Sequence, residues 1–257
     1  MNGFNRHGIS HLSASSINAY STNQALWIQE RLLKKWSKPG PLAFRGSAVE
    51  DGVTHGLKNL SASTDDCAEI TFRTYDEKIG LDLDEKAASE RKLLPGYVEE
   101  ALKELRPYGT PSRCQDRINV EIEGVPVPFI GYTDYVFDNH GLIVDLKTTA
   151  RLPSKVSDAH TRQGALYATA MGNFGMRFCY VKAAPGKSDG ISSRVYELDA
   201  ATIATALYEI KQIAIRMERF LSISNDAEEL AGLIVPDYGH FFWTQESRAE
   251  ARSVFGF

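Results

Sequence analysis

The chain has 257 residues, of which 43% are hydrophobic and 24% are charged, and its formal net charge at pH 7 is −4. This composition excludes a predominantly disordered protein. No apolar run approaches the roughly 18 residues of a membrane span, and residues 1–10 have no hydrophobic signal core, so we expect a cytoplasmic protein that does not enter a membrane.

The first 110 residues are predicted to be almost entirely helical. A helix is expected to begin at Ser13 or Ser15, because serine is a frequent N-cap residue and apolar residues follow at roughly helical spacing as far as Leu33. Pro39-Gly40-Pro41 breaks this pattern. Further helices are predicted over about 45–60, 65–80 and 84–105.

The pattern changes near Pro111, where alternating apolar and polar residues replace the helical spacing. Strands are predicted over 117–123, 127–137 and 142–147, and short turns between them favour an antiparallel meander. A helix over 158–171, a strand over 177–182, an edge strand over 193–198 and an amphipathic helix over 200–222 should follow. This order predicts a single α/β domain over 1–257, with a helical part (1–110), a sheet core (111–222) and a C-terminal tail (223–257).

Asp134, Asp145 and Lys147 are the candidate chemical centre, because they lie on two strands joined by one short turn. Facing side chains on adjacent antiparallel strands have Cβ atoms about 4.5–5.5 Å apart, so the two carboxylates can share a cation if the register suits. Lys147 should point to the same face as Asp145, whereas Leu146 should point to the opposite face, into the core. Like charges this close repel unless a cation binds, and hard oxygen ligands suit Mg²⁺ or Mn²⁺.

Such a group could hydrolyse a phosphodiester. Metal ions can activate a water, neutralise the phosphate and stabilise the leaving oxygen. Lys147 would orient or help deprotonate the water, or stabilise the charge that builds on the phosphate. Asp-x-Lys alone is common, and ordinary solvent-facing strand charges are the alternative interpretation.

Several motifs together resemble the RecB-like branch of the PD-(D/E)XK nuclease superfamily. Gly131-Tyr-Thr-Asp134, Ile143-Val-Asp145-Leu-Lys147-Thr-Thr149 and Gln163-Gly-Ala-Leu-Tyr167 match its G-x-x-D, D-x-K-T and Q-x-x-x-Y patterns. The resemblance extends to Leu12-Ser-Ala-Ser-Ser-Ile17 with Tyr20, to Phe44-Arg-Gly-Ser-Ala-Val-Glu50, and to Phe242-Trp243, Ala249, Arg252 and a late Phe-Gly, as in small phage-type exonucleases. It implies a restriction-endonuclease-like core, a central mixed sheet flanked by helices, with a helical N-terminal region.

The resemblance also implies a role for each motif residue. Glu50 stands where the family often has the histidine of G-x-x-x-H, and it would add a third carboxylate to the metal site. His55 is the competing candidate, but it lies about 140° further round the helix. The expected catalytic residues are Glu50, Asp134, Asp145, Lys147, Gln163 and Tyr167, and the expected metal residues are Glu50, Asp134, Asp145 and Leu146.

Contacts to DNA are expected from residues on both sides of this centre. They are Ser13, Ser15, Ser16, Arg45, Thr148, Gln163 and Tyr167. For the serines, plain helix capping is the alternative role. For Gln163 and Tyr167, which are four apart and so on one helical face, the alternative is packing on the sheet.

The expected cofactor is Mg²⁺ or Mn²⁺, without an iron–sulfur cluster. Iron–sulfur members of this branch use one N-terminal and three C-terminal cysteines, whereas this chain has Thr22-Asn23 in the first region and no cysteine after Cys179. Cys67, Cys114 and Cys179 form no Cys-x-x-Cys pair, which favours ordinary thiols in a reducing compartment. No GxxxxGK[ST] motif is present, so the chain is not itself expected to be a helicase.

The resemblance therefore implies a DNA exonuclease that acts on linear duplex or single-stranded ends, in recombination, repair or phage DNA metabolism. A single-strand annealing protein is an expected partner, and a homo-oligomer is an expected assembly. An endonuclease or flap-processing nuclease with the same chemistry is the first alternative. A catalytically inactive nuclease fold that binds DNA is the alternative of another class. The net negative charge weighs mildly against a nucleic-acid binder, although a local basic groove can hold DNA in an acidic protein.

Overall fold

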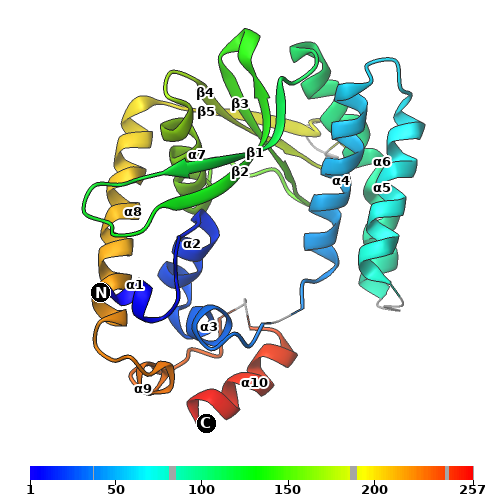
Figure 1. The fold of residues 1–257 in the computed structure, drawn as a ribbon. Coiled ribbons are helices and arrows are strands. Elements are labelled where there is room, and N and C mark those ends of the chain that lie inside the picture. Colours follow the sequence, from blue (N-terminus) through cyan, green and yellow to red (C-terminus); the bar gives the residue numbers. More distant parts are fainter. Residues whose placement is uncertain (37, 81–84, 186–189, 241–242, 257) are drawn as a thin grey trace.

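A five-stranded mixed sheet lies at the centre of the computed structural model, which describes residues 1–36, 38–80, 85–185, 190–240 and 243–256 (Figure 1). Its strands, in spatial order, are β1 (Arg113–Val120), β2 (Phe129–Phe137), β3 (Leu142–Thr148), β4 (Gly175–Val181) and β5 (Ser193–Leu198). This sheet and its flanking helices confirm the predicted α/β core. Asp84, the expected first residue of a helix, and Phe242, in the C-terminal motif, lie outside the described residues.

The strand pairing explains how the sheet is mixed. β1, β2 and β3 form the predicted antiparallel meander. β4 runs parallel to β3, and helix α7 (Asp158–Met171) makes the connection between them that a parallel pair needs. β5 pairs antiparallel with β4 and is the predicted edge strand.

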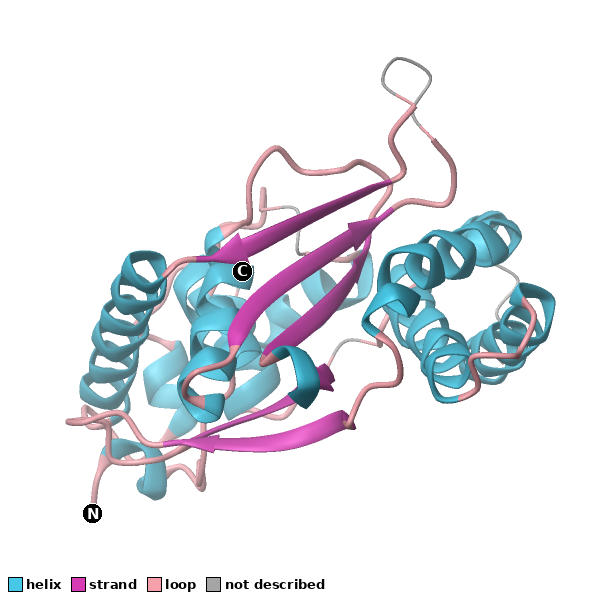
Figure 2. Cartoon of the chain, turned by 90° about the horizontal axis from the view of Figure 1, so that it is seen from above, coloured by secondary structure: helices cyan, strands magenta, loops and turns pink. Residues whose placement is uncertain are grey.

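Helices cover both faces of the sheet (Figure 2). One face packs against α7 and α8 (Ala200–Leu221), and the other packs against α4 (Pro41–Lys58), α5 (Thr64–Ile79) and α6 (Glu85–Leu105). Neighbouring residues of β3 show the division, because Ile143 belongs to the α7–α8 core and Val144 belongs to the α4–α6 core. The centre of the sheet is therefore buried on both sides. Across the described ranges, no helix has both the length and the apolar character that crossing a bilayer takes.

The N-terminal segment is more broken than its helical spacing predicts. It contains α1 (Gly3–Arg6), α2 (Ala14–Thr22), α3 (Gln24–Trp27) and a π-helical turn (Ile28–Leu32), and the chain ends with α9 (Ala227–Ala231) and α10 (Gln245–Phe255). The predicted single helix is interrupted at Asn23, which ends α2 and caps α3 by accepting a hydrogen bond from the Leu26 N–H. Ser13 is the N-cap of α2, as predicted.

Two predicted boundaries are wrong by several residues. α4 begins at Pro41 and not near residue 45, because a proline is well tolerated in the first turn of a helix. β1 runs over Arg113–Val120 and not over 117–123, because the residues that start it pair with the end of β2 without alternating in polarity. Leu12 pairs with Phe129, which ties the start of α2 to the start of β2.

β2 twists strongly between its two ends. Phe129 is buried in the α7–α8 core, whereas Tyr135, six residues on and expected on the same face, is buried in the α4–α6 core. Gln115 of β1 lies across from Asp134, between the pairs Cys114↔Tyr135 and Asp116↔Thr133, and has the unusual positive φ of 52°. Asp134 therefore lies where the sheet turns from one core to the other.

Candidate active site

Asp134 and Asp145 lie side by side at the point where β2 and β3 separate. The ladder between these strands ends at the pair Tyr135↔Val144, and the next residues along the same register are Asp134 and Asp145. The Asp134 carboxylate accepts a hydrogen bond from the Leu146 N–H at 2.8 Å. The side chain of Asp134 thus links the strands where the ladder has ended, and it brings the two acids together as predicted.

The Asp145 carboxylate is buried and has few polar partners. Its exposed fraction is 0%, and no described residue donates a hydrogen bond of good geometry to either of its oxygens. The ammonium of Lys147 forms an ion pair with Asp145 Oδ1, and the Lys147 side chain is 23% exposed. A buried carboxylate with so few partners costs several kcal/mol. A cation at this position would remove that cost.

The charges of the site perturb one another. Burial, and then Asp145 and Glu50, raise the pKa of Asp134 well above its usual range. Burial also raises the pKa of Asp145, although Lys147 opposes the shift. Burial alone would lower the pKa of Lys147, but Asp145 and Asp134 outweigh it and the net shift is upward. Lys147 is therefore a persistent cation, while the two acids resist ionising together without a further positive charge.

Glu50 lies on α4, close enough for its charge to act on both aspartates. Its side chain does not form a cluster with theirs. The Gln115 side chain donates a hydrogen bond to Glu50 Oε1. Burial, then Asp145 and Asp51, raise the pKa of Glu50 to about 7. Among the described residues, no three His, Cys, Asp or Glu side chains form a preassembled metal cluster. The three carboxylates therefore do not come together as expected, and the third, Glu50, is bound by the Gln115 amide.

His55, the competing candidate, lies further along α4. The Asn59 side chain donates a hydrogen bond to the His55 backbone oxygen at 3.1 Å and lies 3.4 Å from the ring Nδ1. Glu50 and the two aspartates, by contrast, are close enough for their charges to act on one another. The helix thus turns Glu50, and not His55, toward the acidic pair, in line with the angular offset between the two.

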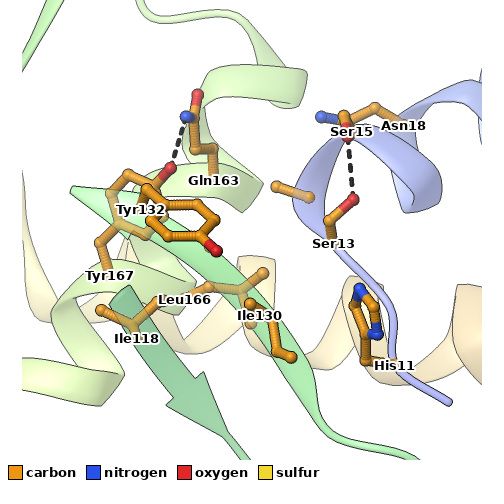
Figure 3. A pocket seen from close by; sticks show the side chains of 12 residues that line it. His11, Ser13, Ser15, Asn18, Ile118, Ile130, Tyr132, Gln163, Leu166 and Tyr167 are labelled. Carbon is orange, nitrogen blue, oxygen red and sulfur yellow. Dashed lines mark hydrogen bonds between the residues drawn. The ribbon is translucent and has the colours of Figure 1, made fainter. Parts of the chain in front are cut away.

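Gln163 and Tyr167 lie on one face of α7, where their side chains contact each other (Figure 3). Gln163 Nε2 donates a hydrogen bond to the Tyr167 hydroxyl at 2.8 Å. Burial, and then Asp145, raise the pKa of Tyr167 to about 12, so its hydroxyl keeps its proton at neutral pH. A Cβ on Gly131 would lie 2.9 Å from the Tyr167 ring, and one on Gly164 would lie 2.9 Å from the Phe178 ring. These two glycines allow α7 to approach the sheet.

His160 is a residue of the site that the motifs do not indicate. It lies one turn before Gln163 on α7, its ring stacks on Phe178 at a centroid distance of 5.7 Å, and its Nδ1 is 2.6 Å from the Tyr180 hydroxyl. Burial, and then Lys147, lower the pKa of His160 to about 4. The ring is therefore neutral at pH 7. The sequence could have indicated His160, because it lies three residues before Gln163 and residues at this spacing share a helical face.

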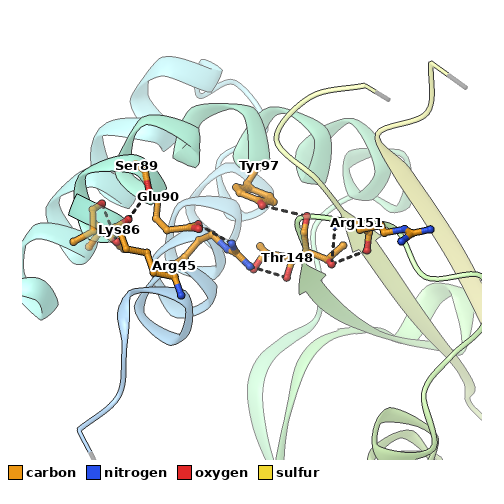
Figure 4. Close-up of polar contacts among 10 residues, drawn as sticks. Arg45, Lys86, Ser89, Glu90, Tyr97, Thr148 and Arg151 are labelled. Atoms are coloured by element: carbon orange, nitrogen blue, oxygen red, sulfur yellow. Dashed lines mark hydrogen bonds and ion pairs between the residues drawn. The ribbon is translucent and has the colours of Figure 1, made fainter. Parts of the chain in front are cut away.

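Arg45 and Thr148 are engaged within the protein (Figure 4). Arg45 is 6% exposed, pairs with Glu90 at 2.7 Å, and donates to Thr148 Oγ1 and to the Thr148 backbone oxygen at 3.2 and 3.1 Å. Its guanidinium also lies 4.8 Å from the centre of the Tyr97 ring. These contacts join α4 and α6 to the end of β3. A phosphate contact by Arg45, as expected from the sequence, would have to compete with them.

The three serines near α2 differ in their availability. Ser16 is buried, and its hydroxyl accepts a hydrogen bond from the Trp27 indole at 3.0 Å, so it is the least available of the three for the expected contact with DNA. Ser13 caps the helix through the Ser16 N–H at 3.1 Å. Ser15 is exposed and bonds to the Ser13 hydroxyl at 2.9 Å. A contact with DNA stays a prediction for Ser13 and Ser15.

The chain matches a known protein family and is similar in fold to a solved structure. The family model described as the PD-(D/E)XK nuclease superfamily matches residues 11–232. A candidate exonuclease from Eubacterium rectale has a crystal structure that matches with a TM-score of 0.64 at 13% identity, over 93% of this chain and 88% of that chain. At this identity the likeness concerns the fold. The structure of SSO0001 also matches at 13% identity, over 74% of this chain and 84% of that chain, but its TM-score of 0.31 is too low to indicate a shared fold. No curated protein sequence matches the chain.

Proposed function

Because the chain belongs to the PD-(D/E)XK nuclease superfamily, we propose that it is a divalent-metal-dependent DNA exonuclease centred on Asp134, Asp145 and Lys147. The observation that supports this most directly is the buried Asp145 carboxylate, to which no described residue donates a hydrogen bond of good geometry, and which lies beside a second acid and forms an ion pair with a lysine. Such a group destabilises a fold unless it is compensated. A catalytic role gives a reason for keeping it there.

The residues present fit a hard divalent cation. Asp134 and Asp145 offer carboxylate oxygens, which Mg²⁺ and Mn²⁺ prefer. Leu146 could contribute only its backbone carbonyl, because its side chain is buried in the α4–α6 core. Glu50 would join after releasing Gln115. When bound, the cation would lower the pKa of a water and neutralise charge on the phosphate.

The protein's own side chains would position the reactants. Lys147, with its raised pKa, stays protonated at neutral pH, which supports a role in stabilising negative charge on the phosphate over a role as a base. The Tyr167 hydroxyl and the Gln163 amide are neutral groups on α7 and could bind the DNA strand or the attacking water. Neutral His160 would help to hold α7 in place through its contact with Tyr180.

Incubation of end-labelled linear DNA and of covalently closed circles with Mg²⁺, Mn²⁺ or EDTA tests this proposal. We expect the linear DNA to be digested with either metal and spared in EDTA, and we expect the circles to persist. Rapid loss of closed circles would assign the chain to the endonucleases. Binding of DNA without cleavage in either metal would indicate the inactive binding module.

Replacing Glu50 with alanine is expected to lower the cleavage rate about 100-fold, because the metal site would lose a carboxylate from α4. The matched control is His55→Ala on the same helix, which should stay within about two-fold of the wild type, because His55 contacts Asn59. Initial rates at several Mg²⁺ concentrations measure both effects. A large loss for His55→Ala with little loss for Glu50→Ala would show that the first motif is misplaced.

We further propose DNA ends, duplex or single-stranded, as the substrate, and recombination, repair or phage DNA metabolism as the setting. In that setting a single-strand annealing protein would be a partner, and a homo-oligomer would be the assembled form. These proposals rest on the resemblance of the motifs to small phage-type exonucleases. Light scattering of the purified protein measures the assembly.

A further inference from the structure

A hollow of about 400 Å³ lies between α2, β2 and α7, next to the candidate active site (Figure 3). Ile118, Ile130 and Leu166 give it an apolar lining. Ser13, the N-cap of α2, and Ser15, in its first turn, face it from the other side. The hollow thus combines an apolar floor with a polar rim, as pockets for ligands commonly do.

Two residues of α7 that line the hollow also lie near the acidic pair. Tyr167 and Gln163, bonded to each other, line it, and Asp145 and Asp134 are close enough for their charges to act on the Tyr167 hydroxyl. Gly131 of β2 also lines it, and three residues of strand span about 10 Å between Gly131 and Asp134. A strand with one phosphate at the aspartates would therefore present a nearby nucleotide to the hollow.

Tyr132 supplies an exposed aromatic surface. It lines the hollow, and half of its surface (50%) is exposed. Its neighbour Gly131 has no side chain, which leaves room for the Tyr167 ring to approach β2. An exposed aromatic ring over an apolar floor is a surface on which nucleobases stack without regard to sequence.

The hollow continues into a region of positive charge. A second hollow of about 170 Å³ shares His11 and Ser13 with the first and is also lined by Arg31, Lys34 and Trp36. The Arg31 guanidinium lies 4.4 Å from the centre of the Trp36 ring. In a chain with a net charge of −4, cations and an aromatic ring at this place mark a local path for a phosphate backbone.

We propose that the larger hollow is a subsite for one unpaired nucleobase of the substrate strand, which stacks on Tyr132 while the strand continues over Ser13 toward Arg31 and Trp36. The inference rests on the proposed function, because it takes DNA at the aspartates as given. A base held in a duplex cannot enter unless it leaves its pair and its stack, which costs free energy. The substrate class is therefore a single strand or a frayed end.

Single-stranded oligonucleotides with one abasic position, stepped along the strand from the end, test the subsite. Binding is measured by fluorescence anisotropy with Ca²⁺ in place of Mg²⁺, and kcat/KM is measured with Mg²⁺. For the wild type, one abasic position near the cleaved bond should weaken binding at least about five-fold, as expected from loss of one stacked base. Other positions should have smaller effects.

The enzyme variants complete a double-mutant cycle with the DNA. Tyr132→Ala should weaken binding of the intact strand by the same factor and should then be insensitive to the abasic position, whereas Tyr132→Phe should restore the wild-type pattern. Tyr208→Ala is the matched control, because Tyr208 is 65% exposed on α8 and lines neither hollow. It should bind as the wild type does.

Three results overturn the subsite: equal effects of an abasic site at every position, additive losses for Tyr132→Ala and the abasic strand, or failure to bind single strands at all. These outcomes are separate from failure of the proposed function, which is the absence of cleavage of any DNA with Mg²⁺ or Mn²⁺. In that case the anisotropy cycle still decides whether the hollow holds a base.

Discussion

Replacing Asp145 with asparagine is expected to lower the rate of Mg²⁺-dependent DNA cleavage at least about 1,000-fold while the protein stays folded. Asparagine has nearly the same shape, so it fills the buried position, but its neutral amide is a much weaker ligand for a hard cation. Initial rates on end-labelled linear DNA measure the loss. Circular dichroism in the near and far ultraviolet checks that the tertiary packing remains.

Asp138→Asn is the matched control for Asp145→Asn. Asp138 directly follows β2, is exposed, and pairs with Arg113 at 2.8 Å on the surface. Surface ion pairs of this kind contribute little to stability, and we expect activity within about two-fold of the wild type. Cleavage by Asp145→Asn within ten-fold of the wild type would refute the role given to Asp145.

Replacing Lys147 with methionine is expected to lower kcat about 100- to 1,000-fold and to change KM for DNA little. Methionine keeps most of the length of the side chain but removes the ammonium that pairs with Asp145 and lies 6.0 Å from the centre of the Phe178 ring. If Lys147 stabilises charge that develops on the phosphate, its loss is felt in the transition state and not in the ground state. Separate measurement of kcat and KM tests this assignment.

Lys103→Met is the control for loss of a lysine. Its side chain is 70% exposed on α6 and lies 3.8 Å from Glu100, so we expect unchanged kinetics. An unchanged kcat for Lys147→Met would show that the ammonium only balances the charge of Asp145. A change confined to the Mg²⁺ concentration needed for activity would lead to the same conclusion.

The elements that were predicted well are those with strong local signals. α7 has the predicted bounds, because Ser157 caps its start through the His160 N–H and Gly172 ends it with a φ of 69°. The antiparallel pairing of β2 with β3 follows from the tight turn between them, which ends at Gly141 with a φ of 55°. In both cases the neighbouring residues alone determine the geometry.

The features that were not predicted depend on contacts between distant segments. The break at Asn23 uses a side chain that caps the next helix, which helical spacing of apolar residues does not reveal. The strong twist of β2 depends on two cores that only the folded chain contains, and on the left-handed backbone of Gln115 in the neighbouring strand. Alternation of residues along one strand carries no information on either.

The same distinction holds within the candidate site. Asp134, Asp145 and Lys147 could be placed together from a two-residue period and a short turn, and the structure brings them together. The hydrogen bond from Gln115 to Glu50 joins β1 to α4, more than sixty residues apart, and no local pattern indicates it. The burial of Arg45 against Glu90 was missed for the same reason.

Crystals grown with Mn²⁺ test the central claim most directly, because anomalous scattering locates the ion independently of activity. The account predicts a Mn²⁺ peak held by the carboxylates of both Asp134 and Asp145, and loss of that peak in Asp145→Asn. Crystals that hold Mn²⁺ elsewhere but show no peak between these two aspartates would contradict it.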